Sequence, residues 1–250
     1  MAAREPGEFC WINLLTPKPE EAKEFFAAVL GWTYSEIPGM GWSILADGGA
    51  VGGLFDTAGP NSPPDTKPQL GVMVKVDSAD ATVAKFNAHG GKATPAWDIG
   101  PNGRMAVCHD PNGAQIDIWQ PLGKPGTEVD PATPGAPTWF ETETTDTDRA
   151  ARFYQDVFGW TPESMPMDGN DYTVFKLGDA FIGGMVAQAS PASPPHWETY
   201  FTVADADAAV AEATKRGATV RRPAHDVPSV GRSASLTSPQ GVPFAVLQYA

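Results

Sequence analysis

Alternating apolar and polar residues predict a strand over residues 9–15, near the start of the chain. One face of this strand carries Trp11, Asn13 and Leu15. After Pro19 the apolar residues follow a helical spacing, and Gly31 is suited to end the helix. The predicted buried stripe of this helix consists of Ala22, Phe25, Phe26, Val29 and Leu30.

The rest of the first half predicts one further strand group and a second unit of the same kind. Short strands are expected at 33–36, 42–46 and 50–55. A Pro- and Gly-rich loop over 57–67 precedes a strand at 69–76, a helix at 79–89 and strands at 92–96, 104–108 and 114–119. Each half of the chain is therefore expected to contain two βαβββ units.

The same pattern occurs twice, at an offset of 128 residues. It carries Trp11 onto Trp139, and the pair Gly31–Trp32 onto Gly159–Trp160. A repeat of this length matches a whole domain. We predict an α+β fold of two tandem domains, 1–122 and 137–250, joined by a proline-rich linker at 123–136. Two βαβββ units in each domain would curl eight strands into an open cup.

Composition limits the classes of partner. The formal net charge of −13 disfavours nucleic acid and anionic membrane surfaces. No run of 18 apolar residues and no apolar signal segment is present, which predicts a cytoplasmic protein. Cys10 and Cys108 are the only cysteines, and both are expected to be buried thiols in strands.

The repeated unit resembles the vicinal oxygen chelate superfamily. The helix ending in Phe-Phe or Phe-Tyr before Gly-Trp and the Asp-Pro-Asn-Gly turn at Asp110 carry this resemblance. The superfamily includes glyoxalase I, extradiol dioxygenases and bleomycin-resistance-type binding proteins, and the chain looks most like its two-domain actinobacterial members labelled glyoxalase-like or hydroxylase. The resemblance implies a cavity for a small molecule inside a cup.

Enzymes of this superfamily hold a divalent metal with side chains from the first, fourth or fifth, and eighth strands. The resemblance places these positions on residues that are mostly unable to bind a metal: Trp11 and Trp139, Gly52–Gly53 and Gly183–Gly184, Gly71 and Thr199, Asp117 and Ala245. Only Asp117 offers a donor, whereas a divalent metal needs three or four. No metal site and no cofactor are therefore expected, although a divalent metal stays the alternative.

Acidic residues are the candidate catalytic groups. Strand alternation puts Glu141 and Glu143 on the concave face of the second half, where Asn13 is the counterpart of Glu141. A cup built across the two halves would bring Glu141 towards Asp117. These carboxylates would then serve as a base, as a partial cation site, or as acceptors of hydrogen bonds from Arg104, Arg232 or the backbone.

Aromatic residues are the candidate ligand contacts. Trp11, Trp119 and Trp139 are expected to line the concave faces and to stack on flat rings. His196, at the start of a strand, is a further candidate contact. Asp98 with Arg104, and Asp226 with Arg232, recur at one spacing, either as ion pairs that fix a loop or as a polar rim for a ligand.

These residues predict metal-independent binding of a small aromatic or apolar molecule by a monomer or homodimer. Sequestration of an antibiotic or metabolite and tailoring in secondary metabolism both fit this prediction. The alternative is a glyoxalase-like lyase, isomerase or oxygenase that uses Glu141 or Asp117 as a base. A third class, a structural domain whose cups are filled by side chains, also stays open.

Overall fold

The computed structural model describes residues 4–59, 66–167, 170–188 and 194–250. The elements of the first half are β1 (Phe9–Thr16), α1 (Pro19–Leu30), β2 (Thr33–Ile37), β3 (Gly41–Ala46), β4 (Gly49–Asp56), β5 (Gln69–Lys75), α2 (Ala79–Ala88), β6 (Lys92–Ala93), β7 (Trp97–Asp98), β8 (Gly103–Ala106), β9 (Cys108–His109) and β10 (Asp117–Pro121). Those of the second half are β11 (Pro137–Thr144), α3 (Thr147–Phe158), β12 (Thr161–Met167), β13 (Asn170–Leu177), β14 (Ala180–Ala187), β15 (His196–Thr202), α4 (Ala206–Lys215), β16 (Thr219–Val227), β17 (Gly231–Thr237) and β18 (Pro243–Tyr249).

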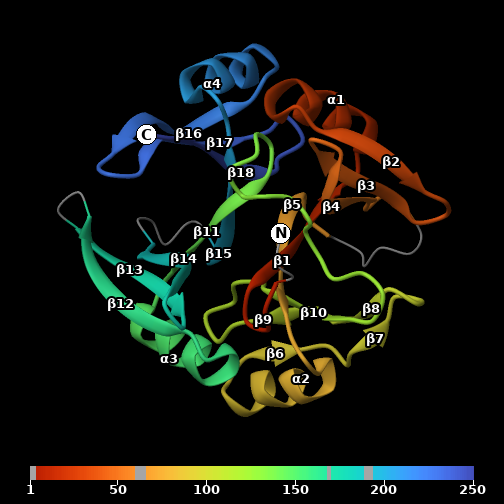
Figure 1. Ribbon diagram of the computed structural model, residues 1–250, viewed down its shortest axis with the longest axis vertical. Coiled ribbons are helices and arrows are strands. Elements are labelled where there is room, and N and C mark those ends of the chain that lie inside the picture. The colour runs from red at the N-terminus through yellow and green to blue at the C-terminus, as the bar shows by residue number, and fades with distance from the viewer. Residues whose placement is uncertain (1–3, 60–65, 168–169, 189–193) are drawn as a thin grey trace.

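Each half forms its own eight-stranded curled sheet (Figure 1). The strand orders are β2-β3-β4-β1-β5-β10-β8-β7 and β12-β13-β14-β11-β15-β18-β17-β16. The predicted α+β fold of two cups is confirmed. Since each cup is built within one half, Asp117 and Glu141 belong to different sheets, and a cup that brings them together across the halves is not formed. We call the two concave faces the first cup and the second cup.

Local sequence explains how the first helix of each half begins and ends. Pro19 occupies the first turn of α1, where its missing N–H costs nothing. The side chain of Asp146 caps α3 by accepting a hydrogen bond from the backbone N–H of Arg149 at 2.9 Å. Gly31 and Gly159 end these helices with left-handed φ values of 72° and 75°, a conformation that glycine adopts without strain.

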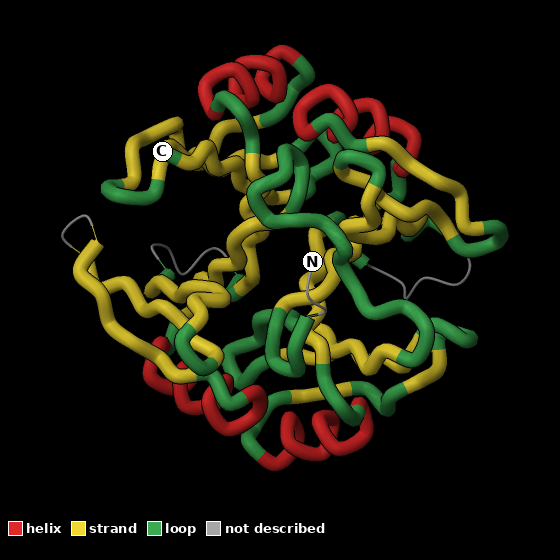
Figure 2. The backbone as a smooth tube through the Cα atoms, in the orientation of Figure 1, coloured by secondary structure: helices red, strands yellow, loops and turns green. Residues whose placement is uncertain are grey.

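The convex faces of the sheets and the helices build a core that the two halves share. Helix α1 packs against α4, and α2 packs against α3, so that each helix pair joins the halves (Figures 1 and 2). The rings of Phe9 and Phe140 stack with centroids 4.1 Å apart. Equivalent tryptophans reach across the junction: Trp32 Nε1 donates to the carbonyl of Gly135 at 2.7 Å, and Trp160 Nε1 to that of Gly7 at 2.8 Å.

The two sheets differ at the edge that follows α2 and α4. In the second half β16 is one continuous strand, whereas the first half has the short strands β6 and β7. Here the side chain of Asp117 accepts a hydrogen bond from the backbone N–H of Cys108 at 3.2 Å, which interrupts the ladder between β8 and β10. Ala245 replaces this aspartate in the second half, and β17 pairs with β18 along its whole length. The strand predicted at 104–108 is therefore split.

Candidate functional site

The concave face of the second sheet carries a set of polar side chains. In the pairing of β11 with β15, Glu141 lies opposite Glu198, and Trp139 lies opposite Tyr200. Side chains alternate along a strand, so Phe140 instead points to the core, where it packs on Phe9. Glu141 and Glu198 are 6% and 2% exposed, so both carboxylates lie in the floor of the second cup.

The fifth-strand position of the second half is Glu198, not Thr199. An offset of 128 residues relates most of the repeat, but the N-caps of α2 and α4 are Ser78 and Asp205, which differ by 127. The sheet pairings agree, because Asp117 lies opposite Met73 while Ala245 lies opposite Tyr200. Thr199 faces the core, and the expectation that this position lacks a donor was wrong.

Two tyrosines hold the carboxylate of Glu141. Tyr172 Oη donates to Glu141 Oε2 at 2.9 Å, and Tyr200 Oη donates to Oε1 at 3.0 Å. Each tyrosine oxygen in turn accepts a hydrogen bond, from Trp139 Nε1 at 2.9 Å and from Arg222 Nη2 at 2.5 Å. The hydrogen-bond acceptors expected for Arg104, Arg232 or backbone donors are thus occupied by phenol groups.

A second carboxylate continues the same network. Arg222 Nη2 donates to Ser235 Oγ at 3.3 Å, and Ser235 Oγ donates to Glu198 Oε2 at 3.2 Å. Arg221 forms an ion pair with Glu198. We call the eight side chains that these contacts connect the second-cup network: Trp139, Tyr172, Glu141, Tyr200, Arg222, Ser235, Glu198 and Arg221.

Gly184 makes room for this network. It lies opposite Glu141 on the neighbouring strand β14. A Cβ atom at Gly184 would overlap the hydroxyl and ring of Tyr172. The glycine at the fourth-strand position therefore lets Tyr172 reach across the sheet to the carboxylate.

Burial decides the protonation of the network. It raises the pKa of Glu141 above the ordinary value, although Arg222 and the two tyrosine hydrogen bonds oppose this shift. It also raises the pKa of Tyr172 and Tyr200, and the neighbouring Glu141 adds to both shifts. Both phenols consequently remain hydrogen-bond donors at neutral pH.

The first cup has different chemistry at the same positions. Asn13 stands where Glu141 stands, and its Nδ2 donates to the sulfur of Met73 at 3.3 Å. Asp117 is buried and accepts hydrogen bonds from Cys108 N and, at 3.1 Å, from Gln115 Nε2. Burial raises the pKa of Asp117 to about 7.

Residues 123–136 lie across the first cup. Lys124 Nζ sits 4.4 Å from the ring centroid of Trp11, and its carbonyl accepts a hydrogen bond from Trp119 Nε1 at 2.9 Å. Thr127 N donates to the carbonyl of Cys10 at 2.7 Å. Figures 1 and 2 show this segment passing in front of the first sheet. Trp11 and Trp119 thus contact the chain itself.

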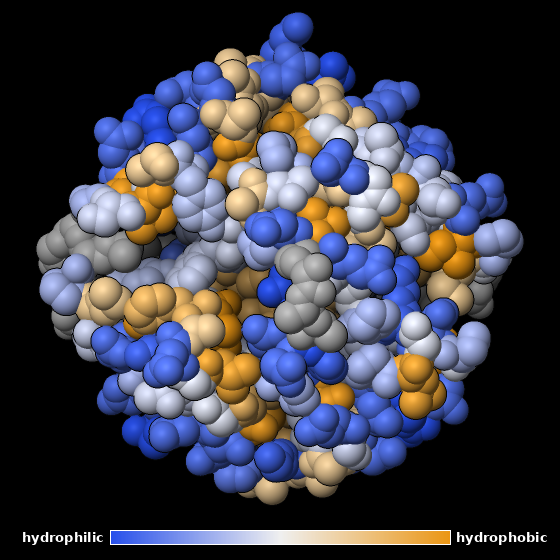
Figure 3. All heavy atoms as spheres, viewed as in Figure 1, coloured by the Kyte–Doolittle hydropathy of each residue, from blue (hydrophilic) through white to orange (hydrophobic). Residues whose placement is uncertain are grey.

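The second cup opens to the surface. Figure 3 shows a hollow at the left, between the β12–β13 hairpin and the strands near the C-terminus, in the region where Figure 1 places the second sheet. The half-exposed Glu143 and His196 lie opposite each other on β11 and β15, next to Glu141 and Glu198 on the same face. His196 Nδ1 lies 3.1 Å from the carbonyl of Pro194.

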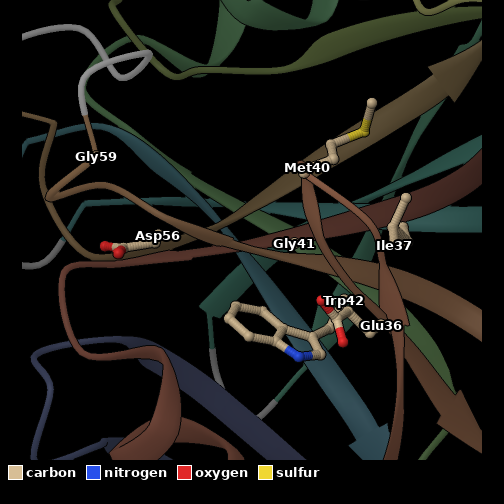
Figure 4. A pocket seen from close by; sticks show the side chains of 8 residues that line it. Glu36, Ile37, Met40, Gly41, Trp42, Asp56 and Gly59 are labelled. Atoms are coloured by element: carbon tan, nitrogen blue, oxygen red, sulfur yellow. The ribbon is translucent and has the colours of Figure 1, made fainter.

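Two pockets lie outside the cups. One of about 290 Å³ surrounds the tip of the β2–β3 hairpin, where Figure 4 shows the carboxylates of Glu36 and Asp56 well apart, so its polar groups do not converge. The other, of about 120 Å³, lies at the junction of the halves and brings Trp11 and Trp139 to one lining, beside the exposed ring of Phe181. Trp139 therefore borders both this pocket and the second-cup network.

The arginines that recur in both halves lie away from the cups. Arg104 pairs with Asp98 at 2.5 Å and with Asp80 in the first turn of α2. Arg232 pairs with Asp226 at 2.8 Å and with Asp207 of α4. The expected aspartate–arginine pairs do form, each with an added helix partner: Asp80, Asp207. They tie a helix to its sheet edge, and the structure does not bring Arg104 or Arg232 to either concave face.

The donors do not fit the metal of the superfamily. The ligand positions supply Asp117 in the first cup and Glu198 in the second, one donor each, and Glu198 is already paired with Arg221. Among the residues that the structure describes, no group of three or more His, Cys, Asp or Glu side chains could hold a metal ion. A divalent metal needs more donors than either cup provides.

The sequence interpretation did not find most of the network. Tyr172, Tyr200, Arg221 and Arg222 have no counterpart in a local motif, because they come from different strands. Glu198 could have been found by aligning the helix N-caps instead of the aspartates that precede and begin α2 and α4.

Sequence comparison agrees with this fold. Residues 9–118 match the model of the Glyoxalase/Bleomycin resistance protein/Dioxygenase superfamily, and residues 139–247 match that of the Glyoxalase-like domain. The chain belongs to this superfamily, as its repeated motifs predicted. No helix within the described ranges is both long and apolar enough to span a membrane.

Relatives extend over nearly the whole chain. The protein named Putative glyoxylase CFP32 of Mycobacterium tuberculosis is 38% identical over 95% of this chain and 93% of its own. Anthracycline biosynthesis protein DnrV of Streptomyces peucetius is 31% identical over 97% of this chain and 94% of its own. The Mn(II)-bound glyoxalase of Novosphingobium aromaticivorans shares the fold, with a TM-score of 0.68 at 14% identity over 99% of this chain and 83% of that one.

Proposed function

We propose that the second cup binds a small aromatic organic molecule without a metal ion. The observation that carries this proposal is the second-cup network, which fills the superfamily's metal positions with hydrogen-bonded side chains. The first cup is a poorer site, because residues 123–136 already contact its tryptophans.

Trp139 and the two tyrosines are the groups that would contact the ligand. Trp139 packs with Tyr200, Ala245 and Leu247, which gives the second cup an apolar wall. Aromatic faces favour flat ligands, and the few polar groups of a pocket fix their orientation. The relation to an anthracycline biosynthesis protein supports an aromatic ligand and a place in secondary metabolism.

Fluorescence titration with 2-naphthol in the presence of EDTA tests this proposal. Saturable quenching of the wild-type protein is expected, and Trp139→Ala should weaken binding by about tenfold, since a buried aromatic contact contributes on the order of 1–2 kcal/mol. Trp11→Ala is the matched control, because it removes the equivalent tryptophan of the first half. Loss of binding in both variants would place the ligand in the junction pocket, and quenching that needs an added divalent metal would contradict the proposal.

An acid–base enzyme is the second candidate function. Burial raises the pKa of Glu141 and places it where a carbonyl or enolisable compound could exchange a proton. Asp117 is the weaker base candidate, since it lies in the cup that residues 123–136 cross. Deuterium exchange into a panel of ketones, lost in Glu141→Gln, would favour this function over binding alone.

A further inference from the structure

The second cup contains one arginine whose donors are only partly used. Arg222 makes its hydrogen bonds through Nη2 alone, to Tyr200 and Ser235. Within the described residues it forms no ion pair, whereas Arg221 beside it is paired with Glu198. A guanidinium carries five N–H donors, so Nη1 and Nε of Arg222 are left for another acceptor.

The surroundings leave Arg222 accessible to a ligand. Its residue is exposed at the edge strand β16, while Glu141 and Glu198 below it are buried and already accept hydrogen bonds. The remaining carboxylate of this face, Glu143, acts on Arg222 only through space. The buried acids consequently do not compete for the free donors.

Arg222 and the apolar wall meet at one residue. Tyr200 accepts the hydrogen bond of Arg222 and lies opposite Trp139 in the sheet. A flat ligand over Tyr200 would meet the indole of Trp139 with its rings and the guanidinium with an edge substituent. The planar fork of arginine matches a carboxylate better than a point charge does.

We infer that the second cup recognises an aromatic carboxylate, whose oxygens pair with Nη1 and Nε of Arg222. This inference rests on the proposed function and adds the ligand's charge. The superfamily's metal supplies positive charge to a cup, and in this chain Arg222 supplies it from β16. The neutral hydroxyl of Tyr200, held between Arg222 and Glu141, fixes the direction of the guanidinium.

Calorimetric titration with 2-naphthoate and 2-naphthamide separates the charge from the ring. The two probes share their aromatic surface, and we expect the wild-type protein to bind naphthoate about tenfold or more tightly than naphthamide, as charge-assisted hydrogen bonds require. Arg222→Gln should remove this preference and leave naphthamide binding unchanged, and Arg222→Lys should restore part of it. Arg216→Gln, on the exposed end of α4, should change neither.

Each other outcome overturns a different statement. Equal binding of both probes by the wild-type protein, or equal weakening of both by Arg222→Gln, would contradict recognition of a carboxylate while the aromatic site stands. If neither probe binds, the proposed function fails together with the inference.

Discussion

Asp117→Asn tests whether the first cup is closed to water. The carboxyl is fully buried beneath the tryptophans that residues 123–136 cover, and its pKa is raised from 3.8 to about 7 chiefly by this burial. Asparagine keeps an oxygen for the N–H of Cys108 and carries no charge at any pH. Stability of the variant should therefore depend less on pH than that of the wild-type protein.

The sign and size follow from proton linkage. Since the folded-state pKa lies above the unfolded value, the native protein binds more protons between these values, and its free energy of unfolding falls as pH rises towards 7. At about 1.4 kcal/mol per pKa unit, the wild-type protein loses about 2 kcal/mol between pH 5 and pH 7 through this group. Asp117→Asn should gain that amount relative to wild type over the same interval.

Urea unfolding at pH 5, 6, 7 and 8 measures the difference. Asp179→Asn, at the exposed β13–β14 turn, is the control and should keep the wild-type dependence on pH. A difference between Asp117→Asn and wild type that stays constant with pH would show that Asp117 titrates as a solvated carboxyl. The closed first cup would then be wrong.

Three further substitutions test the packing. Tyr200→Phe should destabilise the protein by about 1–3 kcal/mol in urea unfolding, because Glu141 loses a buried donor, whereas Tyr34→Phe should cost nothing, since its buried hydroxyl has no hydrogen-bond partner among the described residues. Gly184→Ala should displace Tyr172 and weaken 2-naphthol binding at least tenfold, with retained far-UV dichroism. Trp160→Phe should lower the free energy of unfolding by about 1 kcal/mol or more by removing the hydrogen bond between the halves, and an unchanged value would contradict this contact.

The repeated pattern was sufficient to predict the architecture. Strand alternation placed Trp11 and Asn13 on one face, and the structure keeps both half-exposed between buried neighbours. Trp32 and Trp160 were expected in the core, and they are 1% and 0% exposed. These features depend on local periodicity, which a sequence displays directly.

The site depended on information that local patterns do not carry. A change of one residue in the offset moves every side chain of a strand to the other face, so counting from Asp205 assigned Thr199 instead of Glu198. Residues 123–136 were predicted as a linker from their prolines, and nothing in their composition indicates that Lys124 would lie on Trp11. The network joins five strands, and its contacts follow from the curl of the sheet.

The stoichiometry of ligand binding after metal removal tests the account most directly. Protein treated with EDTA and titrated calorimetrically with 2-naphthoate should bind one molecule per chain, in the second cup, with an affinity that added divalent metal does not change. Two molecules per chain, or binding that appears only after metal is restored, would contradict the account.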